Sequence, residues 1–215
     1  MRLNKVQSVL ILIFSFVIFG CASKLNVVKN LNFIPGEKTL TIAVLPFMTQ
    51  TVKGEEVLTQ VREEVTANLY EGNYRILEIA EIDHYLSQKG ITKPDGLVQG
   101  IRNKKVNFSQ DCGADILIQG RVIEWTKTYL ALHSDIELDV ELFVFDARKG
   151  KMIAKIRKGV IHNSGITRLP TGYISAGTAP LLGLKKSVQQ DVIHTLTREI
   201  SQPLLELNEK SETKI

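Results

Sequence analysis

Two cysteines, Cys21 and Cys112, are the residues of this chain best suited to covalent chemistry. A cysteine can pack in a core, form a disulfide or carry a covalent modification. The chain also contains four histidines, which are His84, His133, His162 and His194. Their spacing is not typical of a metal site, and the sequence has neither a Gly-x-Ser-x-Gly elbow nor a Walker loop. We therefore expect no catalytic residue, no metal and no cofactor.

The residues before Cys21 have the layout of a secretory signal peptide. Arg2 and Lys5 form a positive start, and residues 9–19 form an apolar run of eleven residues. A run of this length is too short to span a bilayer as a helix, which needs about 20 residues. The sequence Ile18-Phe19-Gly20-Cys21 at its end resembles the bacterial lipoprotein box.

This resemblance implies cleavage between Gly20 and Cys21, a diacylglyceryl thioether on Cys21 and acylation of the new amine. Two or more acyl chains hold a protein firmly on a membrane surface. Ala22, in place of an aspartate, favours the periplasmic side of the outer membrane, with the inner membrane less expected. An uncleaved anchor, or an ordinary signal peptide with an incidental cysteine, remains an alternative.

The composition predicts one globular domain. Removal of residues 1–20 leaves 195 of the 215 residues, which is enough for a sizeable core. It also removes Arg2 and Lys5, so the formal charge falls from +4 to +2, and we expect no nucleic-acid partner. With Cys21 acylated, Cys112 has no partner within the chain. We expect Cys112 to be buried and inert, with an intermolecular disulfide as the alternative.

Apolar periodicity and turn residues predict an alternation of strands and helices. Strands are expected at 40–47, 74–79, 114–130, 134–146 and 151–162. Helices are expected at 55–71, around 82–86 up to Gly90, at 95–110, and at 184–202, where Pro203 ends or kinks the last one. The corresponding organisation is a signal peptide at 1–20, a lipidated tether at 21–38, an α/β domain at 39–207 and a disordered tail at 208–215.

The strands at 134–146 and 151–162 predict a hairpin around the turn "DARKGK", whose glycine suits a positive φ. One register pairs apolar residues with apolar residues and acids with bases. Its expected pairs are Val144–Met152, Leu142–Ala154, Val140–Ile156, Glu141–Lys155 and Asp139–Arg157. The acidic row from Asp135 to Glu141 then forms a solvated, charge-paired face rather than a metal site.

Residues 163–183 break all periodicity and are rich in Gly, Pro, Ser and Thr. Long irregular loops inside a compact domain are often functional. Six apolar residues in this loop are candidate interaction residues, namely Ile166, Leu169, Tyr173, Ile174, Leu181 and Leu182. They could instead cover the sheet and cap the last helix. Trp125 is a further candidate, either as an interface anchor or as a residue packed on the sheet under a helix.

The order of "TIAVLPF", a helix, "YRILEI", "GADILIQGRVIEW" and "LFVFDARKGK" resembles the TolB amino-terminal-domain-like fold, over about residues 40–207. That fold recurs in the lipoproteins CsgG, PelC and LpoB. The chain is also similar to a family of outer-membrane lipoproteins of unknown function known from a neisserial vaccine-candidate antigen. Shared features are Gly113-Ala114-Asp115, Trp125 and Tyr129 on the following strand, and the hairpin with Asp146 and Lys151. The resemblance implies a single α/β domain with helices packed on a mixed β-sheet.

It also implies a non-catalytic accessory or assembly component of an envelope export system, which oligomerises or docks on other envelope proteins. An oligomeric export pore of the CsgG type is the alternative, although no segment matches the two extended membrane-crossing hairpins of CsgG. An enzyme is a more remote possibility. No small-molecule substrate is evident from the sequence.

Overall fold

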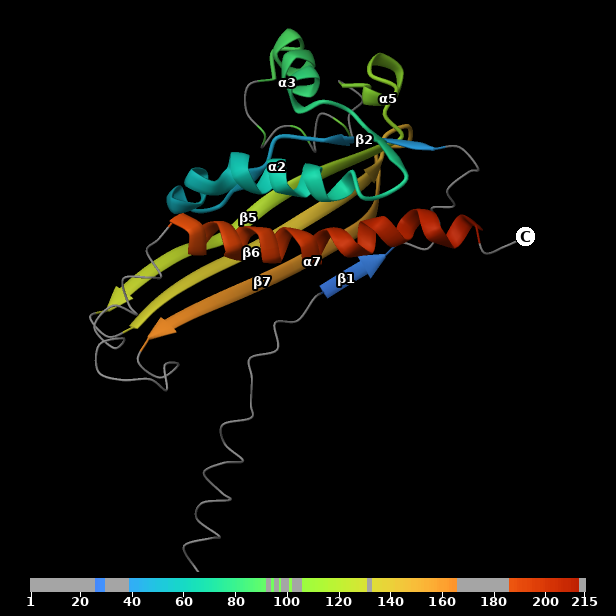
Figure 1. The fold of residues 1–215 in the computed structure, drawn as a ribbon. Coiled ribbons are helices and arrows are strands. Elements are labelled where there is room, and N and C mark those ends of the chain that lie inside the picture. The colour runs from blue at the N-terminus through green and yellow to red at the C-terminus, as the bar shows by residue number, and fades with distance from the viewer. Residues whose placement is uncertain are drawn as a thin grey trace, which may run out of the picture.

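The computed structural model describes residues 26–29, 39–91, 94, 97, 101, 106–130, 133–165 and 186–212. They form one seven-stranded mixed sheet with helices on both faces (Figure 1). The strands are β1 Asn26–Lys29, β2 Leu40–Val44, β3 Met48–Thr49, β4 Tyr74–Ile76, β5 Ile116–Leu130, β6 His133–Asp146 and β7 Lys151–Gly165. The helices are η1 Val52–Val57, α2 Leu58–Leu69, α3 Ile79–Gln88, α5 Phe108–Asp111 and α7 Lys186–Glu212.

The sheet combines an antiparallel half with a parallel half. Its order is β1-β7-β6-β5-β2-β4, and β3 pairs with β5 beside this path. Neighbours from β1 to β5 are antiparallel, whereas β2 is parallel to both β5 and β4. The parallel pairs result from the connections through α2 and α3, because parallel neighbours need a crossover between them.

Helices α2 and α7 lie side by side on one face of the sheet (Figure 1). Their apolar stripes are buried against β5, β6 and β7, as the helical periodicity predicts. The buried positions include Val61, Val65 and Leu69 on α2, and Val192, Leu196 and Ile200 on α7. This face holds the larger of two apolar cores.

Helices α3 and α5 cover the other face, but only at the end of the sheet near the β6–β7 turn (Figure 1). There Tyr85 and Phe108 pack on each other with ring centroids 5.1 Å apart. Leu117 of β5 and Phe145 of β6 belong to the same core. The predicted α/β fold, a mixed sheet with helices packed on it, is confirmed.

Several predicted boundaries differ from the structure. The predicted tether contains β1, which forms because Asn26–Lys29 pairs with β7 and Val27 packs against the main core. Helix α7 continues through Pro203 to Glu212, into the segment expected to be a disordered tail. Burial of Ile200 and Leu204 on either side of Pro203 offsets the lost backbone hydrogen bond. The helix predicted at 95–110 is interrupted at residues 106 and 107, ahead of α5.

The predicted register of the β6–β7 hairpin is wrong by two residues. Its central pairs are Val140–Lys158, Leu142–Ile156 and Val144–Ala154. The difference arises because the turn is longer than predicted and because a bulge at Ile153 shifts the pairing before Phe145 meets Met152. Gly150 has φ 63°, as the predicted turn requires. Since side chains alternate with a period of two, the shift leaves the side chains from Ala154 onward on their predicted face, whereas Met152 moves from the face of Val144 to that of Phe145.

Arg62 joins α2 to the end of β2. Strand β4 ends before it can pair with the carbonyl of Val44, and the guanidinium takes that place. Its Nε and Nη2 atoms donate to the Val44 oxygen at 3.1 and 2.9 Å, and Nη1 forms an ion pair with Asp83 of α3. Burial lowers the pKa of Arg62, although the Asp83 charge opposes this effect. One side chain thus connects the layers on both faces of the sheet.

Candidate interaction surface

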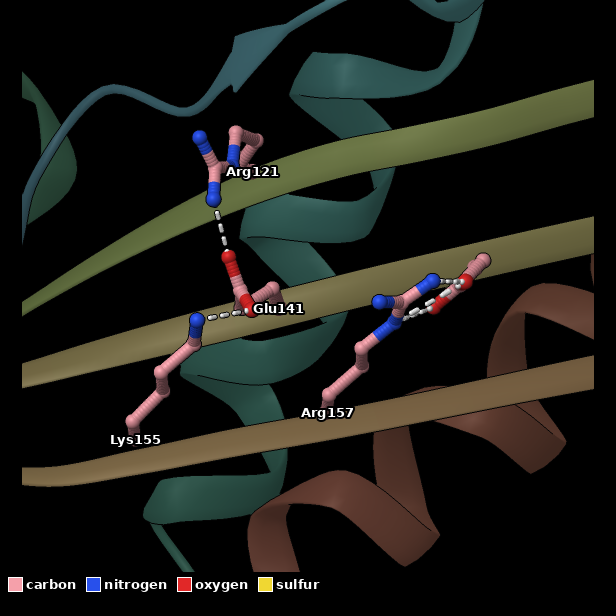
Figure 2. A network of polar contacts seen from close by, with 5 residues as sticks. Arg121, Glu141, Lys155 and Arg157 are labelled. Atoms are coloured by element: carbon pink, nitrogen blue, oxygen red, sulfur yellow. Dashed lines mark hydrogen bonds and ion pairs between the residues drawn. The ribbon is translucent and has the colours of Figure 1, made fainter. Parts of the chain in front are cut away.

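The face of β5, β6 and β7 opposite α2 and α7 carries a network of charged side chains (Figure 2). We call Arg121, Asp139, Glu141, Lys155 and Arg157 the charged ladder. Strand alternation places these residues on one face, since Val140 and Leu142 between them belong to the core under α2 and α7. Helices α3 and α5 leave this part of the sheet uncovered (Figure 1).

Glu141 is the centre of the charged ladder. It is 2% exposed and lies between Arg121 of β5 and Lys155 of β7 (Figure 2). Its Oε1 atom is 2.7 Å from Lys155 Nζ, and Oε2 accepts a hydrogen bond from Arg121 Nη2. Burial alone would raise the pKa of the Glu141 carboxyl, but the hydrogen bonds from Lys155 and Arg121 outweigh it and hold the pKa below its usual range.

Asp139 and Arg157 form a second pair on the same face. Arg157 Nη2 is 2.6 Å from Asp139 Oδ2, and Arg157 Nε lies 3.1 to 3.2 Å from both carboxylate oxygens. This is the fork geometry in which arginine binds a carboxylate most firmly. The hydrogen bonds that Arg157 donates to Asp139, together with the charge of that carboxylate, raise the pKa of Arg157, so the guanidinium stays charged. Both predicted acid–base pairs therefore form, although each joins residues diagonally across the observed register.

The acidic row is less solvated than predicted at its Glu141 end. Besides its two ion pairs, Glu141 has Phe143 as its neighbour on the same face of β6, and this ring lies under two cations. The Arg121 guanidinium carbon is 5.0 Å and Lys155 Nζ 5.5 Å from the ring centroid. Long side chains thus shield Glu141 from water with their apolar stems. The arrangement is a charge-paired surface of three cations and two carboxylates, in which each member forms an ion pair with another and one positive charge is in excess.

A second feature is a set of separate, exposed apolar side chains on β1 and β7. The described residues include five large apolar side chains that are exposed, which are Val28, Val52, Tyr70, Met152 and Ile161. Three of these, Val28, Met152 and Ile161, lie on the neighbouring strands β1 and β7. The sequence alone did not indicate these three residues. Ile161 could have been found, because it occupies the same strand face as Lys155 and Arg157, where alternation predicts a polar residue.

Trp125 is not a surface residue. Its side chain is 1% exposed and belongs to the main core under α2 and α7. Of the two roles that the sequence allowed, packing on the sheet under a helix is therefore correct, and Trp125 presents no surface as an interface anchor in this chain. Lys127 Nζ lies 5.3 Å from the centroid of its ring.

The other predicted site residues lie outside the described part of the chain. These are Gly20, Cys21, Ile166, Leu169, Tyr173, Ile174, Leu181 and Leu182. Only the ends of the long loop are placed, at Gly165 of β7 and Lys186 of α7.

Cys112 is half-buried beside α5 rather than fully buried, and its thiol is free. Burial raises the pKa of this thiol, and the nearby carboxylates of Glu81 and Asp111 add to the effect. The thiol is therefore a weaker nucleophile at neutral pH than an ordinary cysteine, in line with the expected inertness. Among the described residues, no group of three His, Cys, Asp or Glu side chains could hold a metal ion. The described helices include none long and apolar enough to cross a membrane.

Comparison with solved structures shows what this fold resembles. The chain is similar to a PelC variant from Paraburkholderia phytofirmans, which was solved as a dodecamer, with a TM-score of 0.50 and 13% identity over 86% of this chain and 99% of that chain. It is also similar to the lipoprotein GNA1162 from Neisseria meningitidis, with a TM-score of 0.47 and 22% identity over 73% of this chain and 99% of that chain. The LpoB C-terminal domain from Escherichia coli matches with a TM-score of 0.40 and 14% identity over 61% of this chain and 89% of that domain.

The family comparison is more specific. No curated protein matches the chain at a significant level. The model of the GNA1162-like lipoprotein family matches residues 36–201, which extend from just before β2 into α7 and include the whole charged ladder. This match covers well over half of the chain, and the chain therefore belongs to the GNA1162-like family of lipoproteins.

Proposed function

We propose that this protein is a non-catalytic accessory component of an envelope export or assembly system, anchored by lipid on the periplasmic side of the outer membrane. The observation that carries the proposal is the match to a lipoprotein family directly behind a lipoprotein box at Cys21. The domain would act by self-association or by docking on other envelope proteins. Cleavage after Gly20 and acylation of Cys21 are parts of the same proposal.

The surface supports a docking role. The charged ladder presents a sheet face whose side chains are held in place by ion pairs, and such a face can bind a partner with little rearrangement. PelC, which has this fold, was solved as a dodecamer. Lipid anchoring confines copies to one surface and raises their effective concentration, so a modest affinity is enough for assembly. We include the loop residues from Ile166 to Leu182 in the proposed interaction surface.

The test is expression of the full-length chain and of Cys21→Ala in a Gram-negative host, with an alkyne-tagged palmitate. We expect the wild type to incorporate label and to fractionate with the outer membrane, and the variant to do neither while it stays folded by circular dichroism. Cys112→Ser is the matched control and should label like the wild type. Label that persists in Cys21→Ala would contradict the anchor. Ion conductance of the purified protein in planar bilayers would contradict an accessory role and favour a pore.

A further inference from the structure

We propose that the edge of the sheet formed by β1 and β7 is the surface that lies against the membrane. This inference rests on the proposed lipidation of Cys21 and adds an orientation to it. The partner is a lipid surface, and the contact residues are Val28, Arg157 and Ile161.

The lipid anchor leaves the fold at the start of β1. Strand β1 is the outermost strand of the sheet, and it pairs with the middle of β7. Asn26 lies opposite Arg157, and β7 runs from Lys151 to Gly165. The segment that leads back to Cys21 therefore leaves from the middle of an edge and not from one end of the molecule.

The anchor is short compared with the strand beside it. Cys21 precedes Asn26 by five residues, so even a fully extended segment reaches only about 17 Å. From Arg157, β7 continues for eight residues to Gly165, or about 26 Å. In the other direction it extends six residues to Lys151, or about 20 Å.

These lengths exclude an upright orientation on either end of the sheet. If the Gly165 end of the sheet faced the membrane, that end would extend about 9 Å deeper than the acylated Cys21. This is because β7 reaches about 26 Å beyond Arg157 and the anchor only about 17 Å. The end near Lys151 would also pass below the cysteine, and there α3 and α5 add further bulk (Figure 1). Resting on the β1–β7 edge keeps Cys21 at the lipid surface, because the anchor leaves the fold from the outermost strand of that edge.

The composition of this edge fits a lipid interface. Val28 is 68% and Ile161 is 54% exposed, so transfer of both side chains into lipid would be favourable. Arg157 lies between them, with its side chain 49% exposed and its charge held by Asp139. Exposed apolar side chains with an adjacent cation are typical of protein surfaces that lie in the headgroup layer. By contrast, Arg75 lies on β4, at the opposite edge of the sheet, and the proposed orientation keeps this edge away from the lipid.

The test places a fluorophore at single cysteines in full-length, acylated Cys112→Ser protein. The reporters are Val28→Cys and Ile161→Cys on the proposed edge and Arg75→Cys as the matched exposed control. Each protein is reconstituted in vesicles of phosphatidylethanolamine and phosphatidylglycerol that contain a nitroxide-headgroup lipid. We expect quenching several-fold stronger at positions 28 and 161 than at 75. Hydrogen exchange of the unlabelled protein should slow in β1 and β7 on reconstitution.

The outcomes separate this inference from the proposed function. Intact-mass analysis reports acylation, and a chain without acyl groups would overturn both. Acylated protein with equal quenching at all three positions would overturn the orientation alone. Crosslinks between copies through positions 28 and 161, without quenching of the reporters there by the nitroxide lipid, would also overturn the orientation. The edge would then be covered by a second copy of the chain and not by lipid.

Discussion

At the residue scale, burial and charge oppose each other most strongly at Glu141. The carboxylate is almost fully buried, yet it stays ionised because Arg121 and Lys155 both contact it. The substitution Glu141→Gln keeps the shape and removes the charge, which leaves both cations without a counter-charge and one of them facing an amide NH₂ instead of an acceptor oxygen. We expect the free energy of unfolding to fall by about 1–3 kcal/mol at neutral pH. Urea unfolding of the Cys21→Ala chain measures this, with Glu137→Gln, on a less buried position of the same face, as the matched control.

The same residue predicts a dependence on pH. Since the pKa of Glu141 is lower in the folded protein than in the unfolded chain, its contribution is fully present above the unfolded pKa and is lost as pH falls through the folded pKa. The stability difference between wild type and Glu141→Gln should therefore be constant from about pH 7 to pH 5 and shrink below about pH 4. A difference that grew on acidification would contradict the assignment of the charge.

Arg62 is the second residue with a predicted structural effect. It satisfies the Val44 carbonyl and pairs with Asp83, so Arg62→Met would leave a buried acceptor unpaired. We expect a loss of about 1–3 kcal/mol in the free energy of unfolding, and little rescue by Arg62→Lys, because an ammonium cannot make the same forked contact. Arg198→Met, at an exposed position of α7, should be nearly neutral. Equal effects of the two methionine substitutions would show that the Val44 contact is dispensable.

At the element scale, the β6–β7 hairpin shows how local and long-range information divide. Alternation in each strand determines which side chains share a face, but two registers that differ by two residues preserve those faces equally well. Turn length and the bulge at Ile153 decide between them. Long side chains then reach diagonally, which explains why the predicted ion pairs form in an unpredicted register.

The register itself is a testable prediction. In nuclear Overhauser spectra of the Cys21→Ala chain, backbone contacts should connect Glu141 with Arg157, and Leu142 with Ile156. Backbone contacts that directly pair Glu141 with Lys155 would instead support the register predicted from the sequence, which has a shorter turn and no bulge. Contacts between β5 and β6, such as Arg121 with Glu141, provide an internal control in the same spectra.

At the scale of the whole molecule, the question is which surfaces remain for partners if the β1–β7 edge faces lipid. The segment from Ile166 to Leu182 lies in the sequence between Gly165 of β7 and Lys186 of α7, and its apolar residues are our candidates for self-association. We expect Tyr173→Ser with Ile174→Ser to reduce the assembly size of the anchored protein without changing its melting temperature. Mass photometry in nanodiscs and thermal unfolding measure the two properties separately. A lower melting temperature, or an unchanged assembly, would show that these residues are structural.

The sequence by itself determined features whose signals are contiguous along the chain. The charged start, apolar run and Gly20-Cys21 indicate a lipoprotein signal without any fold. The apolar periods of two and of 3.6 residues identified the strands β5 to β7 and the helices α2 and α7, because each element repeats its pattern many times. Their order was enough to predict a mixed α/β sheet, which the structure confirms.

Only the tertiary structure decided how distant elements combine. The four residues of β1 carry too short a pattern to be recognised, and they form a strand because β7 supplies their hydrogen bonds. Trp125 became a core residue because α2 and α7 cover its face, which strand alternation alone cannot show. Glu141 became buried because residues from three strands converge on it. Burial and register depend on contacts between segments far apart in the chain, and such contacts leave little trace in local sequence.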